Sequence, residues 1–230
     1  MEEKKETGRV EAFSDGVFAI AITLLVLDLK PAVDRWLEVH ERDTLFEAMW
    51  GQWPVFLAFL ISFALIGIMW LNHHRLFNLI RRIDHTLLIL NLLVLLAATI
   101  VPFPTALLGA YSNSNEFERF RDAALIYNGT FLLVAIGYNA LWRYAIHSHR
   151  LLDQHVDMQA VKRLERQYLF GPLLYVVAFA IAWFSPEVSL GLNALLAIFY
   201  LLPGVELHKR DIHQAHKPTS VQTSHQDHNS

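Results

Sequence analysis

Most of the apolar residues in this chain fall into six long blocks separated by polar connectors. Each block approaches the roughly 20 residues that an α-helix needs to cross the hydrocarbon core of a bilayer. Backbone groups inside a bilayer must be hydrogen-bonded internally, so blocks of this length predict membrane-spanning helices. The predicted spans cover residues 9–29, 54–72, 86–108, 123–144, 168–184 and 188–202. The last two are the shortest, so a count of five is the alternative.

The composition agrees with an all-α, polytopic membrane protein. Hydrophobic residues make up 54% of the 230 residues and charged residues only 18%, whereas a soluble domain carries about 25% charged residues. The chain has no cysteine, which excludes a disulfide framework and a thiolate metal site. We expect one membrane domain over residues 1–205. Residues 206–230 form a polar, histidine-containing tail whose composition is typical of disorder.

The basic residues predict the orientation in the membrane. With six spans, the N-terminus, the second and fourth connectors and the C-terminal tail share one side. That side carries 14 of the 19 Lys and Arg residues. Because short cytoplasmic loops are enriched in Lys and Arg, both termini are predicted to be cytoplasmic.

No sequence motif for enzymatic chemistry is present. The chain lacks the glycine-rich dinucleotide and P-loop motifs, the G-x-S-x-G nucleophile motif and the H-E-x-x-H zinc motif. We therefore expect neither an enzyme nor a bound cofactor or metal, and nothing indicates nucleic-acid binding.

The first span is unusual because it carries a carboxylate, Asp15, beside Ser14. A carboxylate in a membrane helix costs about 2.5–3.5 kcal/mol on insertion scales, so it is normally functional or paired. On a helical wheel, Asp15 lies about 240° from Arg9. A stripe of other residues lies within about 40° of Arg9: Phe13, Gly16, Ile20, Thr23 and Leu27, with Leu24 at its margin.

Three roles are open for Ser14 and Asp15: a helix cap, a proton relay, or a polar network that holds the first span against its neighbours. We favour the network, because polar side chains at the same membrane depth end the second span and begin the third. These candidate partners are Trp70, His73, His74 and Asn91. The sequence does not decide which of the two histidines takes part.

The stripe is also ambiguous from periodicity alone. Most apolar stripes on membrane helices face lipid or other helices. The alternative is a pore wall in an oligomer, where Ile20, Leu24 and Leu27 would form a dewetting constriction and Thr23 would offer hydroxyl oxygens to a cation.

Other local signals concern the ends of the helices. Lys30 and Pro31 are predicted to end the first span, and Pro102 and Pro104 to bend or break the third. Residues 44–50 predict a short amphipathic helix at the membrane interface.

The pattern Arg9-x-x-x-Phe13-Ser14-Asp15 resembles the signature of the transmembrane protein 175 family, the lysosomal and bacterial potassium channels. Three later segments fit the same family: Trp70–Phe77, Asn91–Leu96 and Pro102–Thr105. The resemblance covers roughly residues 9–110 closely and the remainder only in span count. It is a resemblance to the bacterial form with a single six-span repeat.

The resemblance implies a homotetramer in which the first span lines a central pore. It implies a constriction at Ile20, with Thr23, Leu24 and Leu27 following on the same stripe, and no carbonyl filter. The motif residues, with Trp70, the histidines and Asn91, would brace the pore helix. The implied function is a K⁺-preferring leak channel of the plasma membrane that also passes protons, as animal relatives do. Two rivals are a proton-coupled transporter with Asp15 and a histidine as relay, and a non-conducting scaffold.

Overall fold

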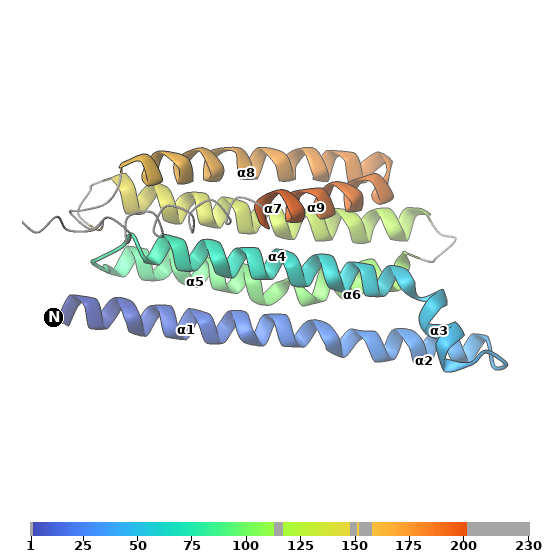
Figure 1. Cartoon of the computed structure of the whole chain (residues 1–230). Helices are drawn as coiled ribbons and strands as arrows, with labels where there is room; N and C mark the ends of the chain where they lie inside the picture. Colours follow the sequence, from blue (N-terminus) through green and yellow to red (C-terminus); the bar gives the residue numbers. More distant parts are fainter. Residues whose placement is uncertain (1, 113–116, 148–150, 152–157, 202–230) are drawn as a thin grey trace, which may run out of the picture.

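The computed structural model describes residues 2–112, 117–147, 151 and 158–201, and this part of the chain is all-helical (Figure 1). Its elements are α1 (Glu2–Leu24), the 3₁₀ segment η1 (Leu25–Asp28), α2 (Leu29–Val39), α3 (Leu45–Gly51), α4 (Trp53–Phe77), α5 (His85–Ile100), α6 (Pro102–Tyr111), α7 (Phe117–His147), α8 (Met158–Phe184) and α9 (Pro186–Leu201). The predicted tail, residues 206–230, lies outside the described residues.

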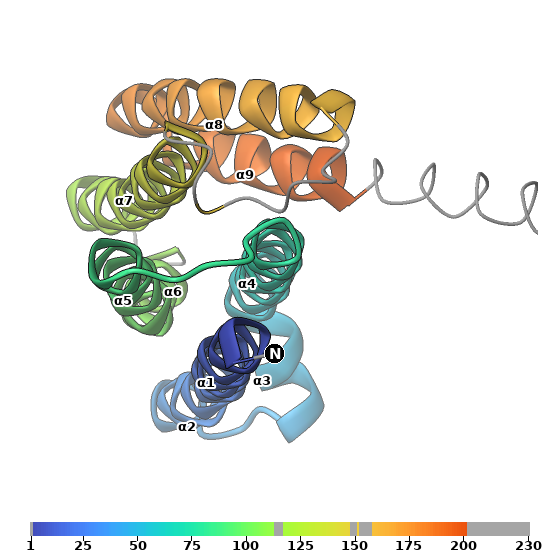
Figure 2. The ribbon, with the colours of Figure 1, turned by 90° about the vertical axis from the view of Figure 1, so that its left-hand side faces the viewer.

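The long helices lie side by side and run back and forth along one axis (Figure 1). Seen along that axis, α1 lies at one edge of the bundle, α4 and the α5–α6 pair lie in the middle, and α7, α8 and α9 form the opposite edge (Figure 2). α1 packs against α4, α5 and α6, whereas α7 packs against α5, α6, α8 and α9. One side of α1 is therefore left uncovered by the described part of its own chain.

Four helical segments in the described part are long and apolar enough to cross a membrane: Thr7–Val39, Trp53–Phe77, His85–Tyr111 and Phe117–His147. Two shorter apolar helices follow, Tyr168–Phe184 and Pro186–Ile198. The structure thus has the all-α membrane architecture expected from the sequence, with the last two predicted spans again the shortest.

The predicted stop at Pro31 was wrong. The helix continues through α2 to Val39, and the irregularity lies one turn earlier, in η1. Proline has no N–H for the carbonyl four residues back, here that of Leu27, and its ring crowds that carbonyl. Pro31 itself lies in the first turn of α2, where a missing N–H costs little. The chain therefore tightens into a 3₁₀ turn before the proline rather than ending at it.

The third predicted span is broken as its prolines indicate: α5 ends at Ile100 and α6 begins at Pro102. The predicted amphipathic helix corresponds to α3, and its first turn is closed by a capping box. Thr44 Oγ1 accepts the Glu47 N–H, and Thr44 N–H donates to the Glu47 carboxylate at 2.7 Å.

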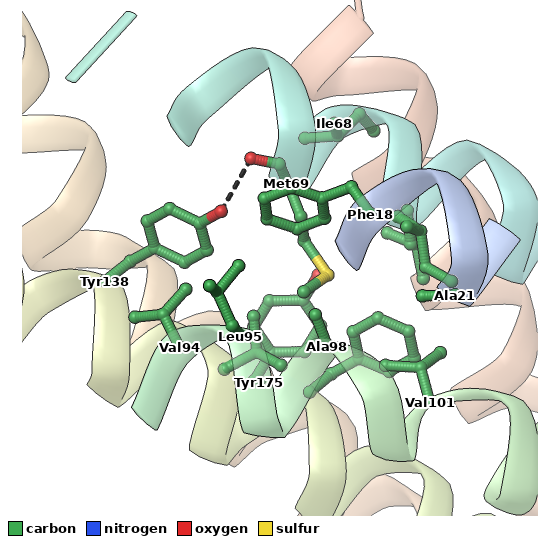
Figure 3. Close-up of a cluster of buried hydrophobic side chains, with 14 of the residues drawn as sticks. Phe18, Ala21, Ile68, Met69, Val94, Leu95, Ala98, Val101, Tyr138 and Tyr175 are labelled. Atoms are coloured by element: carbon green, nitrogen blue, oxygen red, sulfur yellow. Dashed lines mark hydrogen bonds between the residues drawn. The ribbon is translucent and has the colours of Figure 1, made fainter. Parts of the chain in front are cut away.

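The apolar core lies where the middle layer meets both edges. Phe18 and Ala21 of α1 meet Ile68 and Met69 of α4 in a cluster of buried side chains (Figure 3). The same cluster continues through α5 to Val101, and then to Tyr138 of α7 and Tyr175 of α8. Among the described residues, α1 is thus joined to the rest of the bundle along one face.

Candidate functional site

The two faces of α1 differ sharply in the structure. The covered face carries Ser14, Phe18, Ala21 and Leu25, all buried. The uncovered face carries the apolar stripe, where Ile20 is 59% exposed. Phe13, Thr23, Leu24 and Leu27 are exposed on the same stripe. A run of large apolar side chains outside the core requires another covering, which is lipid, water in a narrow pore or a second chain.

A hydrogen-bonded chain joins α1 to α5 and α4 on the covered face. Asn91 Nδ2 donates to Ser14 Oγ at 3.1 Å, and Ser14 Oγ donates to the Val10 carbonyl at 2.8 Å. His73 Nε2 lies 2.8 Å from Asn91 Oδ1. All three linked side chains, Ser14, Asn91 and His73, are buried. Three helices are thus joined by hydrogen bonds, which act together with side-chain packing in holding membrane helices to one another.

The geometry indicates a neutral His73. An amide oxygen only accepts, so Nε2 of the ring must be the donor to Asn91. Nδ1 is buried without a hydrogen-bond partner among the described residues. A neutral ring with its proton on Nε2 leaves only a lone pair unsatisfied there, whereas an imidazolium would leave an N–H. The ring is also enclosed by aromatic neighbours, stacked on Phe77 and edge-on to Phe18.

A second set of polar contacts lies at the rim of the same α1–α4 contact. Trp70 Nε1 donates to Asp15 Oδ1 at 2.8 Å. His74 Nδ1 lies 2.6 Å from Glu11 Oε1, and its ring stacks on Trp70. The two histidines therefore have different partners, since His73 contacts Asn91 and His74 contacts Glu11.

Glu11 is not among the site residues predicted from the sequence. The sequence does contain an indication of its role, because Glu11 precedes Asp15 by four residues and lies on the same helical face. The pair of carboxylates meets the pair Trp70 and His74, which are also four residues apart, on the antiparallel helix α4.

Two motif residues do not join these bonds. Arg9 and Phe13 are exposed and border a cavity of about 540 Å³ between α1 and the start of α5. Buried Asn91 also lines this cavity. Among the described residues, no three His, Asp or Glu side chains converge as a metal site would require.

Thr23 is held in one orientation by its own helix. Its Oγ1 donates to the Ile20 carbonyl at 2.9 Å. That bond uses the only hydroxyl proton, so the remaining lone pairs on the exposed oxygen are free to accept. The oxygen can therefore contact a cation, but it has no proton left to donate to a hydrogen-bond acceptor.

Two tyrosines that were not predicted from the sequence contact the part of α4 that carries Trp70 and His73, on the side away from α1. Tyr138 Oη donates to the Met69 carbonyl at 2.6 Å (Figure 3), and Tyr168 Oη donates to the Asn72 carbonyl at 3.3 Å. The two rings are stacked, almost parallel, with centroids 6.1 Å apart. α7 and α8 thereby fix the stretch of α4 that contacts α1.

Comparisons with known proteins identify the family. A family model described as the endosomal/lysosomal potassium channel TMEM175 matches residues 9–102. A protein of Chamaesiphon minutus named as a potassium channel is 48% identical over 200 residues, which cover 87% of this chain and 96% of that protein. A protein of Streptomyces collinus, also named as a potassium channel, is 40% identical over 196 residues, covering 85% of this chain and 91% of that protein.

A solved structure agrees with these relatives. The crystal structure of a lysosomal potassium-selective channel TMEM175 homologue from Chamaesiphon minutus matches this fold with a TM-score of 0.76 and 46% identity. The match covers 86% of this chain and 98% of that chain. The residues matched by the family model include the whole α1–α4–α5 network described above. By the identity and coverage of its relatives, this chain belongs to the TMEM175 family.

Proposed function

We propose that this protein is a potassium-preferring cation channel of the plasma membrane in which four copies of the chain surround a pore lined by α1. The observation that carries the proposal is the division of α1 into a bonded face and an exposed apolar stripe. Ser14 is fully buried on the first face, whereas Ile20 and Leu27 are 59% and 64% exposed on the second. The family's named potassium channels support the same function.

In the proposed pore, the side chains of Ile20 form the constriction, and Leu24 and Leu27 extend the apolar wall. An aliphatic ring gates by excluding water and has no oxygens to replace the hydration shell of an ion. Selectivity is therefore modest. Thr23 supplies the nearest side-chain oxygen, one turn from Ile20, in an orientation suited to accept a cation.

The polar contacts of α1 are proposed to brace the pore helix rather than to conduct. Ser14 and Asp15 face α5 and α4, away from the stripe, and their bonds run to Asn91 and Trp70. Arg9 and Phe13 are the motif residues nearest the cytoplasmic opening. Because they lie on the same exposed face as Ile20, we assign them to that opening of the proposed pore rather than to the bracing contacts.

The proposed topology has six crossings with both termini in the cytoplasm. The helices alternate in direction from α1 through α4, α5–α6, α7 and α8 to α9 (Figure 1). This places the N-terminus, the α4–α5 connection and the α7–α8 connection at one end of the bundle. Most of the Lys and Arg residues belong to that end, as the cytoplasmic side requires.

Potassium flux into liposomes that hold the purified protein tests the function. Ile20→Asn should raise the flux and lower the preference for K⁺ over Na⁺, because a polar ring admits water into the constriction. The matched control is Ile136→Asn, at an isoleucine exposed on α7 far from α1, which should leave both quantities unchanged. Mass measurement in detergent should give a tetramer.

The same experiment examines proton permeation and the transporter alternative. A channel of this kind also passes protons when a pH gradient is imposed without K⁺. Asp15→Asn should reduce the yield of tetramer but leave the flux per tetramer near the parent value. If Asp15→Asn abolished flux in intact tetramers while Ile20→Asn had no effect, conduction along α1 would be wrong and a relay at Asp15 would replace it.

A further inference from the structure

The short helix α3 presents an unusually apolar outer face. Four large side chains lie on one side of α3, and the first residue of α4 extends the same side: Leu45, Phe46, Met49, Trp50 and Trp53, all exposed. Phe46 is 78% exposed and Trp50 76%. Aromatic side chains on one face of an amphipathic helix are typical of segments that lie in a membrane interface.

The opposite side of α3 is clamped to α2 by Trp36. A Cβ on Gly51 would lie 2.5 Å from the Trp36 ring, so the indole packs directly on the glycine backbone. Trp36 Nε1 donates to Asp43 Oδ2 at 2.9 Å, and the ring stacks on His40 with centroids 4.2 Å apart. The contacts of Trp36 therefore fix the orientation of α3. They hold the apolar side chains of α3 on the side that faces away from α2.

The depth of α3 follows from the length of α4. The contact between His74 and Glu11 marks the polar rim at one end of the bundle. Between His74 and Trp53, α4 rises about 31 Å at about 1.5 Å per residue, and the hydrocarbon core of a bilayer is about 30 Å thick. Trp53 therefore lies at the opposite boundary of the hydrocarbon, and α3 follows at the depth of the lipid head groups. Tryptophan is enriched at that depth.

We propose that α3 is a membrane-interface anchor whose apolar face inserts into the leaflet opposite the N-terminus and which holds α2 at a fixed height through Trp36. The occupant of the face is the lipid bilayer, because Trp53 makes the face continuous with the apolar surface of α4. The proposal requires only that the chain spans a bilayer, so it stands apart from the conduction mechanism.

Because the sequence contains no cysteine, a single introduced cysteine can be labelled at a chosen position. Single-cysteine variants Phe46→Cys and Trp50→Cys are labelled with a nitroxide and reconstituted in liposomes. Two references calibrate them: Glu41→Cys, on the exposed α2–α3 connection, and Leu133→Cys, exposed midway along α7. Electron paramagnetic resonance then measures collisions of each label with oxygen, which concentrates in lipid, and with a water-soluble nickel chelate.

The expected result is an oxygen-to-nickel collision ratio at 46 and 50 that is at least about threefold higher than at 41 but lower than at 133, as a helix in the membrane interface requires. A ratio like that at 41 would place the face in water. Low collision rates with both reagents would place it against a second copy of the chain. Either outcome overturns the proposal. If a labelled variant fails to assemble, Leu45→Cys and Met49→Cys examine the same face at neighbouring positions.

Discussion

The side-chain amide of Asn139 on α7 donates a 2.6 Å hydrogen bond to the backbone carbonyl of Tyr168 on α8. In an uninterrupted helix this carbonyl would receive the N–H of the residue four positions later. That residue is Pro172, which has no N–H. Asn139 therefore supplies from a neighbouring helix the bond that proline removes, and α8 can carry a proline in its interior.

This relationship predicts a strong coupling between Asn139 and Pro172. Asn139→Leu should lower the free energy of unfolding by about 1–2 kcal/mol, because a partly buried carbonyl loses its donor. In a Pro172→Ala background the new N–H serves that carbonyl, so the same substitution should cost no more than about 0.5 kcal/mol. Unfolding titrations of the four proteins in mixed micelles measure the difference. Equal costs in the two backgrounds would contradict the assignment.

Thr23→Val should lower the preference for K⁺ over Na⁺ by about two- to tenfold, since it removes an oxygen from the proposed pore while keeping the side-chain shape. Thr99→Val is the matched control. Thr99 is exposed on α5, and its Oγ1 donates to the Leu96 carbonyl at 2.8 Å, the same i−3 geometry as in Thr23. Reversal potentials under paired K⁺ and Na⁺ gradients give both ratios. A loss of selectivity in both variants would point to general destabilisation rather than to Thr23.

The bond between His73 and Asn91 makes a prediction about stability. Asn91→Leu should lower the free energy of unfolding by about 1–3 kcal/mol, because the His73 N–H is left buried without an acceptor. Adding His73→Phe should recover much of that loss, since removing both polar partners can be nearly neutral. Thermal unfolding in detergent compares the single and double variants. A double variant as unstable as the sum of its two single changes would show that the bond is not the cause.

Gly51→Ala should destabilise the α2–α3 hairpin by about 1–3 kcal/mol, because its methyl group would enter the space of the Trp36 ring. Gly67→Ala provides the control, since a Cβ there meets nothing within 4 Å. In a helix interior that second change should be neutral or stabilising by about 0.5–1 kcal/mol. Thermal unfolding monitored by tryptophan fluorescence distinguishes the two variants.

Sequence periodicity was informative wherever one helix could be considered alone. The wheel separated Ile20 from Asp15, and in the structure Ile20 is exposed whereas Asp15 contacts Trp70. Apolar block lengths likewise predicted the all-helical membrane fold. The roles of these residues in a pore stay predictions.

Relationships between distant helices could not be derived from the sequence. Asn139 and Tyr168 are 29 positions apart, and no period links an amide on one helix to a carbonyl left open by Pro172 on the next. The prediction that the first helix ends at Pro31 was wrong for a different reason. A proline acts on the turn before it, so its effect falls on η1 rather than on the residues that follow.

The 3₁₀ segment η1 separates Leu27 from the rest of the exposed stripe. Ile20 and Thr23 belong to α1, which α4 and α5 hold, whereas Leu27 lies within the joint that leads to α2 and its clamp on α3. In the proposed pore, a small rotation at this joint would change the radius of the Leu27 ring while the Ile20 ring kept its own. The apolar wall at Leu27 would then respond to the α2–α3 clamp near the membrane surface, whereas the constriction at Ile20 is held from within the bundle.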